Sequence, residues 1–439
     1  MRYFIETWGC QMNDHDSEKL AGTLETMGYA PTEEPSEADI YLLNTCTIRE
    51  KAEEKVFSRL GVLRQVKQQR NGDMVIGVTG CVAQQEGGQI FSRAPYVDLV
   101  LGTQALKQLP EMIENVASHK GHQVNVGQDP ENHLFPPHNI SRRSRIKGLI
   151  TIMEGCDNYC TYCIVPFTRG RERSRPWEDI VAEAQRLADN GTKEIELLGQ
   201  NVNSYYSTIS FAELLRKLNE IEALEVVRYV SPHPKDFDRD VIETLRDCPR
   251  IATNIHLPAQ SGNSRILKRM GREHTREHYL EKVAMIREVL GNNCSLTSDF
   301  IVGFPGELEK EFNDTVTLLQ DVGYDRIFSF MYSPRPGTGA IKHGDPVPQE
   351  EKSRRLQILQ QTQNELQKER MTGRIGRDYQ VLVDTLKPED RFPVAGRTRD
   401  NILVHLEAKG APERYFGRNL AVKITGAGLH TLRGQIIED

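Results

Sequence analysis

Short apolar segments alternate with longer helical segments in the first third of the chain, and this order limits the possible fold more than any other feature. The segments rich in β-branched and aromatic residues predict strands, and the segments rich in Leu, Glu, Lys and Arg predict helices. The predicted strands are Tyr3–Trp8, Asp39–Asn44, Met74–Thr79 and Val97–Leu101, and the predicted helices are Asp16–Met27 and Glu50–Lys67. Strands that alternate with helices indicate a parallel, doubly wound α/β sheet.

Three cysteines follow the first three predicted strands at equivalent places. Cys10, Cys46 and Cys81 each come within two residues of a strand end, at intervals of 36 and 35 residues. Because the carboxyl ends of parallel strands meet at one edge of a sheet, the three thiols are expected to converge there. A free cysteine is more often a small apolar core residue, which is the interpretation favoured for Cys248 and Cys294. Three cysteines in equivalent positions instead predict a shared metal site.

A second series of strands and helices begins at residue 148, after a polar stretch over residues 119–147 that predicts a linker. Six β-α units in about 200 residues favour a partial or full parallel barrel, whose chemistry lies on the loops after the strands. The predicted strands are Gly148–Met153, Glu194–Leu198, Val226–Val230, Ile251–His256, Ser295–Val302 and Arg326–Met331. The predicted helices are Trp177–Asn190, Phe211–Leu218, Thr275–Leu290 and the long polar Glu350–Met371.

The loop after the first of these strands carries Cys156, Cys160 and Cys163. A four-iron cluster normally takes four thiolates, so a run of three leaves one iron open to a substrate or cofactor. The alternative is a structural zinc knuckle, which requires a fourth Cys or His close by. The nearest histidines, His138 and His233, are distant in sequence. A three-thiolate iron–sulfur cluster is therefore the favoured interpretation.

The last 67 residues, 373–439, change character and predict a small β-barrel. Eleven Lys and Arg stand against nine Asp and Glu in this segment, whereas the whole chain has a net charge of −6. Any nucleic-acid surface must therefore be local. The predicted strands are Tyr379–Asp384, Ile402–Leu406 and Ala421–Thr425, with turns at Gly396, Gly417, Gly426, Gly428 and Gly434.

The N-terminus and the apolar segments indicate a cytoplasmic protein. Glu6 interrupts the first apolar run too early for a signal peptide, and no apolar stretch approaches the roughly 20 residues that span a bilayer. Thiols stay reduced in the cytoplasm, so clustered cysteines there favour metal binding over disulfides.

The triple-cysteine loop resembles a known signature. Its pattern Cys-x3-Cys-x-aromatic-Cys is similar to that of the radical S-adenosylmethionine (SAM) enzymes. The resemblance implies that SAM binds the open iron and that one-electron reduction cleaves it to a 5′-deoxyadenosyl radical. Polar residues and glycines at strand ends are often only turns, but several here resemble the SAM-binding elements of that barrel. The candidate SAM-binding residues are Tyr162, Gly199, Gln200, Asn201, Gln260, Ser261, Asp299 and Ile301.

Two groups of three cysteines, in this domain order, resemble the methylthiotransferases over nearly the whole chain. The implied domains are an N-terminal methylthiotransferase domain (1–118), a linker (119–147), a radical SAM domain (148–372) and a TRAM β-barrel (373–439). The resemblance implies two [4Fe–4S] clusters, held by Cys10, Cys46 and Cys81 and by Cys156, Cys160 and Cys163. It implies no side-chain nucleophile. Ala259, Ser298 and Leu308 depart from the family pattern near the expected SAM contacts.

One branch of this family fits best. Gln11-Met12-Asn13 stands where the branch acting on ribosomal protein carries Lys-Asn. The resemblance therefore implies methylthiolation of C2 of N6-isopentenyl-adenosine at position 37 of tRNA, with SAM as methyl donor and radical source. The alternatives are methylthiolation of an Asp of a ribosomal protein, methylthiolation of threonylcarbamoyladenosine, and a non-catalytic RNA-binding protein with zinc at both cysteine groups.

Basic residues flank the triple-cysteine loop and recur in the last domain. Lys and Arg that neutralise phosphates dominate nucleic-acid affinity, although such runs are often only a solvated surface. The implied partners are the tRNA anticodon stem-loop, an electron donor such as a flavodoxin or ferredoxin, and proteins that supply sulfur or clusters; a monomer is expected. The candidate RNA-binding residues are Arg142, Arg143, Arg145, Arg169, Arg171, Arg173 and Arg397.

Overall fold

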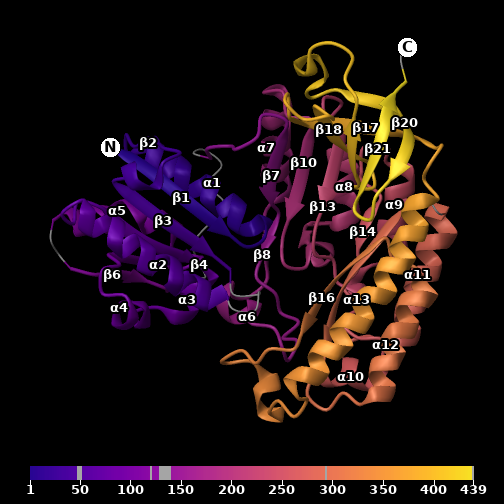
Figure 1. Cartoon of the computed structure of the whole chain (residues 1–439), viewed down its shortest axis with the longest axis horizontal. Helices are drawn as coiled ribbons and strands as arrows, with labels where there is room; N and C mark the ends of the chain where they lie inside the picture. Colours follow the sequence, from indigo (N-terminus) through magenta and orange to yellow (C-terminus); the bar gives the residue numbers. More distant parts are fainter. Residues whose placement is uncertain (47–51, 119–120, 128–139, 292–293, 438–439) are drawn as a thin grey trace. The chain divides into compact units, whose positions relative to one another are not determined.

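The computed structural model describes residues 1–46, 52–118, 121–127, 140–291 and 294–437 (Figure 1). The chain divides into two compact units, and each is described by itself. The first unit comprises Met1–Ser144, Glu154–Asp157 and Ile164–Arg175, and the second comprises Arg145–Met153, Asn158–Cys163 and Pro176–Asp439. No helix in the described part of the chain has the length and apolarity needed to cross a membrane.

The first unit is built on a six-stranded sheet in which every neighbouring pair of strands is parallel. The strand order β2-β1-β3-β4-β5-β6 places the first strand of the chain inside the sheet, as doubly wound folds do. The strands are β1 (Arg2–Trp8), β2 (Ala30–Pro31), β3 (Ile40–Thr45), β4 (Val75–Gly80), β5 (Leu99–Leu101) and β6 (Gln123–Asn125).

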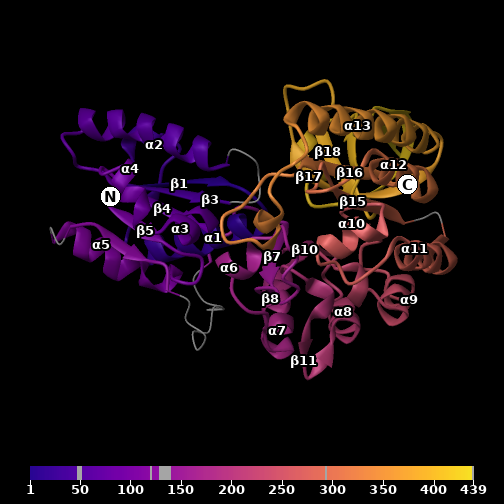
Figure 2. The ribbon, with the colours of Figure 1, turned by 90° about the horizontal axis from the view of Figure 1, so that it is seen from below.

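Helices cover both faces of this sheet, and α2 and α5 lie on opposite sides (Figure 2). All six residues of β3 are buried, as expected for a strand between two layers of helices. Tyr41 and Leu43 of β3 belong to one core cluster, and Ile40 and Leu42 belong to another. The α-helices of this unit are α1 (Gln11–Thr26), α2 (Ala52–Gln69), α3 (Cys81–Glu86), α4 (Gln89–Arg93), α5 (Leu109–Ala117) and the short α6 (Val165–Thr168).

The predicted strands and helices of this unit are confirmed, and two short strands were not predicted. The first residues of the predicted helix Glu50–Lys67 lie outside the described residues. β2 has only two residues, and β6 lies inside the predicted linker, of which residues 119–120 and 128–139 are not described. Strands this short carry too few side chains to produce a periodic pattern.

The second unit contains two three-stranded parallel sheets, β13-β10-β7 and β14-β15-β16. A parallel bridge between Val227 and Ile251 links their neighbouring edges. The described strands therefore form an open, partial barrel, which confirms the predicted α/β class. They are β7 (Lys147–Thr151), β10 (Glu194–Leu198), β13 (Val226–Tyr229), β14 (Asn254–His256), β15 (Ser295–Val302) and β16 (Arg326–Met331).

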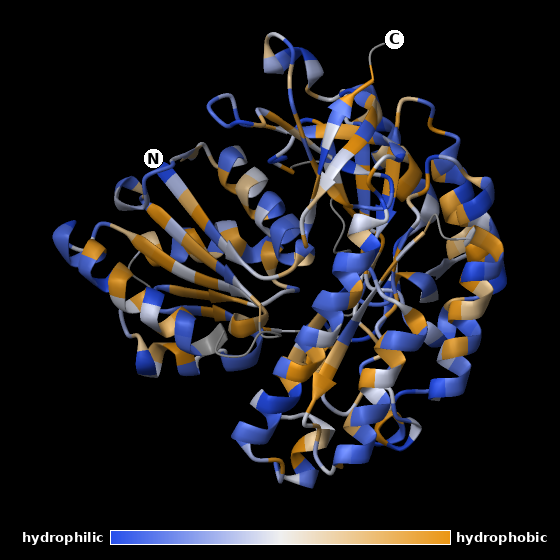
Figure 3. Ribbon diagram, turned by 45° about the vertical axis from the view of Figure 1, so that its right-hand side comes forward, coloured by the Kyte–Doolittle hydropathy of each residue, from blue (hydrophilic) through white to orange (hydrophobic). Residues whose placement is uncertain are grey.

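The helices of this unit pack on the barrel strands through one large core cluster. Strand residues such as Ile150 and Leu197 share this cluster with Ile180 and Leu214 from the helices. Hydrophobic residues are concentrated on the strands, whereas the helices are hydrophilic on their outer faces (Figure 3). The helices are α7 (Trp177–Asp189), α8 (Phe211–Asn219), α9 (Arg239–Asp247), α10 (Ser264–Arg269), α11 (Arg276–Leu290), α12 (Glu309–Val322) and α13 (Gln349–Thr372).

The C-terminal segment closes into a five-stranded barrel in the order β17-β18-β19-β21-β20. β18 and β21 were not predicted, and the prediction that Gly396, Gly426 and Gly434 form turns is wrong, because they lie within strands. A Cβ atom at Gly396 would overlap the carbonyl oxygen of Leu382, so this strand requires glycine where it crosses its neighbour closely. The strands are β17 (Asp378–Leu386), β18 (Val394–Thr398), β19 (Leu403–Leu406), β20 (Asn419–Ala427) and β21 (Thr431–Ile436).

The buried Arg228 and the partly exposed Arg399 join this small barrel to the partial barrel within the second unit. Arg228 of β13 lies 3.0 Å from Glu194 and donates hydrogen bonds to the carbonyl oxygens of Thr398 and Arg399, each at 2.9 Å. Arg399 in turn donates to the carbonyl oxygen of Ile251. The two barrels therefore share a polar interface built from an ion pair and side-chain to backbone hydrogen bonds.

Leu43→Ala tests the packing of the central strand of the first unit. Leu43 is fully buried, so the cavity should reduce the local stability of β3 and its neighbours by about 2–5 kcal/mol. Hydrogen exchange read by mass spectrometry should show correspondingly faster exchange of the β3 amides. Val62→Ala on α2, at a position that is 47% exposed, is the matched control and should change exchange little. Equal effects in both variants would contradict the assigned core.

Candidate functional site

The first unit brings Cys10, Cys46 and Cys81 together at one edge of its sheet. They directly follow β1, β3 and β4, which are neighbours in the sheet, and Cys81 begins α3. The thiol of Cys46 is hydrogen-bonded to both Cys10 and Cys81. The β-α spacing therefore produces the convergence that the sequence predicts.

Gly9 and an asparagine pair allow this close approach. A Cβ atom at Gly9, where φ is +154°, would come within 2.7 Å of Cys46 Cβ. Asn13 Nδ2 donates to Asn44 Oδ1 at 2.9 Å, and Asn44 Nδ2 donates to the carbonyl oxygen of Asn13 at 2.8 Å. Cys10 Sγ donates to Asn13 Oδ1 at 3.4 Å. The asparagine pair thus ties the first turn of α1 to the end of β3.

Arg169 places a buried positive charge beside these cysteines. Its side chain lies 2.8 Å from Asp16 and is hydrogen-bonded to Cys81. The hydrogen bond from Cys46, opposed by burial and helped by Arg169, lowers the pKa of Cys10 to about 6 and that of Cys81 to about 7. The pKa of Cys46 is raised because it shares its proton with its two neighbours. The thiolate is the form that binds metals, so this environment favours ligation.

The triple-cysteine loop runs from the first unit into the second. In the first unit, the N–H of Cys156 donates to the carbonyl oxygen of Gly170 at 3.2 Å. In the second unit, the N–H of Cys163 donates to the carbonyl oxygen of Cys160 at 2.9 Å, and Thr161 bonds to Met270. Each end of the loop is therefore fixed within its own unit.

Several candidate SAM-binding residues lie together near the carboxyl ends of the barrel strands. Gln260, with φ of +71°, forms a parallel bridge with Phe300 by bonding to the backbone of Asp299 and Ile301. Tyr162 packs in the same small hydrophobic cluster as Ile301, and burial raises its pKa. Ser261 follows Gln260 directly and is buried.

The remaining candidates follow β10. Gly199 and Asn201 are buried, and Gln200 between them is partly exposed. Asn201 Nδ2 donates to Asp236 Oδ2 at 2.9 Å, whereas its Oδ1 is buried and accepts no hydrogen bond. A Cβ atom at Gly199 would come within about 2.5 Å of Met153 Cγ, so the loop requires glycine there.

A polar cluster that the sequence did not reveal lies in the same unit. Arg272 donates from Nη1 to Cys160 Sγ at 3.6 Å and from Nη2 to the carbonyl oxygen of Pro258 at 2.8 Å. His233 and His274 stand with their ring centroids 5.9 Å apart. Burial, helped by the charge of Arg272, lowers their pKa values to about 2 and about 3. The one sequence feature that could have indicated this cluster is the position of His233 just after the predicted strand Val226–Val230.

Unpaired atoms in this cluster indicate a polar ligand. Arg272 Nε and His233 Nε2 are buried without a hydrogen-bond partner in the described structure. Buried polar atoms normally have hydrogen-bond partners, so neighbouring buried atoms that lack them point to a bound polar group. Such a group must be polar and reach the carboxyl ends of the strands, which SAM's amino-acid and ribose groups would satisfy. In the described residues, no three His, Cys, Asp or Glu side chains have the geometry of a single-ion site.

Most of the candidate RNA-binding arginines form ion pairs within their own units. Arg142 lies 3.1 Å from Glu18, Arg143 lies 3.5 Å from Asp14, Arg171 lies 2.9 Å from Asp157, and Arg397 lies 3.8 Å from Asp384. Arg143, Arg145 and Arg171 are exposed, whereas Arg173 and Arg397 are partly exposed. Arg169 is buried beside Cys81, which favours a role at the cysteines over contact with RNA.

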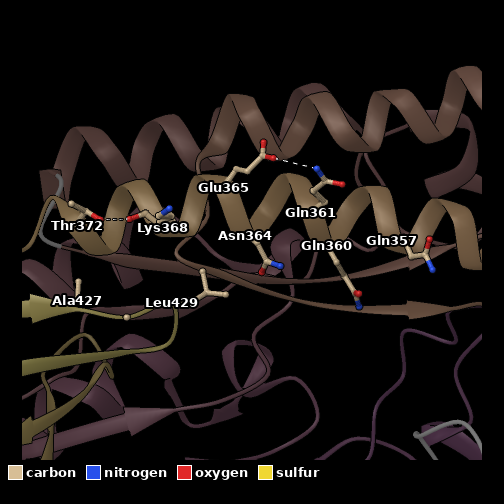
Figure 4. Close-up of a pocket in the computed structure, with 10 residues that line it drawn as sticks. Gln357, Gln360, Gln361, Asn364, Glu365, Lys368, Thr372, Ala427 and Leu429 are labelled. Carbon is tan, nitrogen blue, oxygen red and sulfur yellow. Dashed lines mark hydrogen bonds between the residues drawn. The ribbon is translucent and has the colours of Figure 1, made fainter.

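A groove of about 610 Å³ lies elsewhere in the second unit, between α13 and the turn after β20 (Figure 4). Its lining includes Gln360, Asn364, Lys368 and Leu429. No cysteine and no candidate residue from the sequence lines it.

Comparisons with known proteins agree with this architecture. Residues 2–102 match the model of the uncharacterized protein family UPF0004, and residues 150–319 match that of the radical SAM superfamily. The solved structure of the radical SAM methyltransferase TsrM from Kitasatospora setae superposes with a TM-score of 0.57 at 15% identity, over 77% of this chain and 76% of that one. OxsB, a cobalamin-dependent SAM radical enzyme, superposes with a TM-score of 0.55 at 14% identity, over 82% and 56%. At these identities the likeness shows the fold.

Curated relatives extend over the full length. A protein from Koribacter versatilis is 44% identical over 99% of this chain and 98% of its own length. A protein from Pseudomonas aeruginosa is 44% identical over 100% of this chain and 98% of its own. The partial barrel with its cysteine loop is thus that of a radical SAM enzyme. More narrowly, the chain belongs to the tRNA-2-methylthio-N(6)-dimethylallyladenosine synthase family.

Gly155→Ala tests the anchoring of the triple-cysteine loop. Gly155 has φ of +80°, and a Cβ atom there would overlap the carbonyl oxygen of Arg171. The variant should break the hydrogen bond of the Cys156 amide and increase its exchange with solvent. Gly72→Ala is the control, because Gly72 has φ of +91° but open space around it. Slow exchange of Cys156 in Gly155→Ala would contradict the close packing.

The two buried histidines predict a pH dependence of stability. Their folded pKa values lie below the usual 6.5, so below about pH 6.5 the unfolded chain binds protons that the folded chain does not. Stability should therefore fall as the pH drops from about 6.5 to about 5, as measured by urea unfolding. The double variant His233→Gln/His274→Gln should show a shallower fall. An unchanged slope in the double variant would assign the pH dependence to other groups.

Proposed function

We propose that this chain methylthiolates C2 of N6-dimethylallyladenosine at position 37 of tRNA, next to the anticodon. The observation that carries the proposal is the convergence of Cys10, Cys46 and Cys81 in a chain that also holds a radical SAM cysteine loop. A radical SAM barrel requires one cysteine triad, so the second triad needs a function of its own. The full-length relatives are named tRNA-2-methylthio-N(6)-dimethylallyladenosine synthases, which supports sulfur insertion into a tRNA base.

The two triads would each hold a [4Fe–4S] cluster. Three thiolates leave one iron of each cluster without a protein ligand. When bound, the cluster at Cys156, Cys160 and Cys163 would supply the electron that cleaves SAM to the radical that activates the C–H bond, and the cluster at Cys10, Cys46 and Cys81 would carry the sulfur to be inserted. Asn13 and Asn44 fix the loops that carry the first triad, and Gly155 fixes the start of the second.

The side chains at the carboxyl ends of the barrel strands would bind SAM and exclude water from it. Tyr162 and Ile301 exclude water on the side of Cys160 and Cys163, because they pack in one hydrophobic cluster with Phe304. Asn201, Gln260, Ser261 and Asp299, with the backbone of Gly199 and Gln200, are proposed to orient SAM. His233 and His274 stay neutral near neutral pH and offer hydrogen bonds without adding charge.

The tRNA would be contacted by the more exposed basic residues. Arg143, Arg145, Arg171 and Arg397 are available to phosphates if their surface ion pairs open, which costs little for exposed pairs. An electron donor such as a flavodoxin or ferredoxin and proteins that supply clusters or sulfur complete the proposal, for a monomer acting in the cytoplasm.

Iron content and nucleoside analysis test the proposal together. Anaerobic reconstitution should give about eight irons per chain, and Cys10→Ala should give about four. Mass spectrometry of tRNA nucleosides from a strain lacking the gene should show 2-methylthio-N6-dimethylallyladenosine only when the chain is restored. Cys248→Ala is the control for both readouts, because Cys248 is a core residue.

Other results would redirect the assignment. About four irons in the parent, unchanged in Cys10→Ala, would remove the second cluster. Zinc without sulfide would support a non-catalytic RNA-binding protein. Modified threonylcarbamoyladenosine or a modified ribosomal Asp, with dimethylallyladenosine unchanged, would name a different substrate.

A further inference from the structure

Arg272 stands out among the groups around the triple-cysteine loop. It lies in the turn after α10, where its N–H bonds to the carbonyl oxygen of Leu267 at 2.9 Å. The bond from Nη2 to Pro258 O fixes one arm of the guanidinium, and the other arm reaches Cys160 Sγ. The guanidinium is therefore held in place independently of the cysteine that it contacts.

The surroundings preserve the positive charge of this side chain. A guanidinium stays protonated in proteins, and that of Arg272 is buried. His233 and His274 beside it are neutral because their pKa values are depressed. The positive charge therefore acts on Cys160 in a buried setting, where water screens it little.

We propose that Arg272 is a positioning residue that raises the reduction potential of the cluster held by Cys160. One-electron reduction adds one negative charge to a cluster and its thiolates, and the electron comes from the external reductant. A fixed N–H···S bond and a buried cation both stabilise that more negative state, and hydrogen bonds to sulfur are an established means of tuning cluster potentials. The inference rests on the proposed function only in that Cys160 must ligate a cluster.

The second unit also provides a matched control. Arg287 of α11 donates from Nη1 to Cys294 Sγ at 3.4 Å, the same type of contact to a cysteine outside both triads. Cys294 is buried in the main core cluster. Arg287→Gln thus removes a guanidinium–sulfur contact of equal kind from a cysteine that holds no cluster.

The test is a redox titration followed by electron paramagnetic resonance. The parent is the full chain with Cys10, Cys46 and Cys81 replaced by Ala, so that one cluster of about four irons is observed. Arg272→Gln should lower the equilibrium constant for reduction at least tenfold, which is a shift of about 59 mV to more negative potential for one electron. The reduction potential of Arg272→Lys should lie between those of Arg272→Gln and the parent, because Lys keeps the positive charge but lacks the guanidinium N–H that bonds to Cys160 Sγ. The reduction potential of Arg287→Gln should equal that of the parent.

The possible results distinguish a failure of this inference from a failure of the proposed function. An Arg272→Gln protein with about four irons and an unshifted potential overturns the inference and leaves the proposed function intact. If Arg272→Gln takes up no iron, the reduction potential of Arg272→Lys is compared with that of the parent instead. Equal potentials in these two proteins overturn the inference. A parent without any iron–sulfur absorption contradicts the proposed function itself. A shift of equal size in Arg287→Gln also overturns the inference, because it would reflect a general change in packing.

Discussion

The carboxyl ends of parallel strands are the constraint on which both candidate sites depend. Every neighbouring pair in the six-stranded sheet is parallel, so the ends of β1, β3 and β4 meet at one edge and bring three cysteines together. The same geometry in the second unit gathers the loops after β10, β13 and β14 around Arg272 and the two buried histidines. Antiparallel strands would send alternate loops to opposite ends and disperse both groups.

Much of this could be predicted from the sequence because the signals are local or periodic. Strand ends can be assigned from hydrophobic runs, so the convergence of Cys10, Cys46 and Cys81 followed from spacing alone. Arg272 and His274 could not be found in this way, since their meeting with Cys160 depends on how separate loops fold over one barrel. The prediction of a turn at Gly396 was wrong for a related reason. Glycine occurs both in turns and where two strands approach closely, and only the position of the neighbouring strand distinguishes the two cases.

A buried guanidinium accompanies the cysteines in each unit, Arg169 in the first and Arg272 in the second. Burying a charge is costly unless it is paired, and each arginine is paired by different means. Arg169 has the carboxylate of Asp16, whereas Arg272 has a backbone carbonyl and the sulfur of Cys160. Arg169 therefore has a carboxylate partner in addition to the cysteines, whereas the side-chain contacts of Arg272 described above are to a carbonyl oxygen and a sulfur. The two groups of cysteines therefore lie in different electrostatic surroundings.

The polar interface around Arg228 has a consequence for how such a chain can be divided or recombined. The guanidinium of Arg228 is held by Glu194 on one side and by the backbone of residues 398–399 on the other, so the small barrel supplies hydrogen-bond acceptors that the larger barrel lacks. Exchanging this small barrel for that of a distant relative would require backbone carbonyls at the same two places. A transferred C-terminal barrel therefore has to preserve these acceptors, because a buried guanidinium left without them would be destabilising.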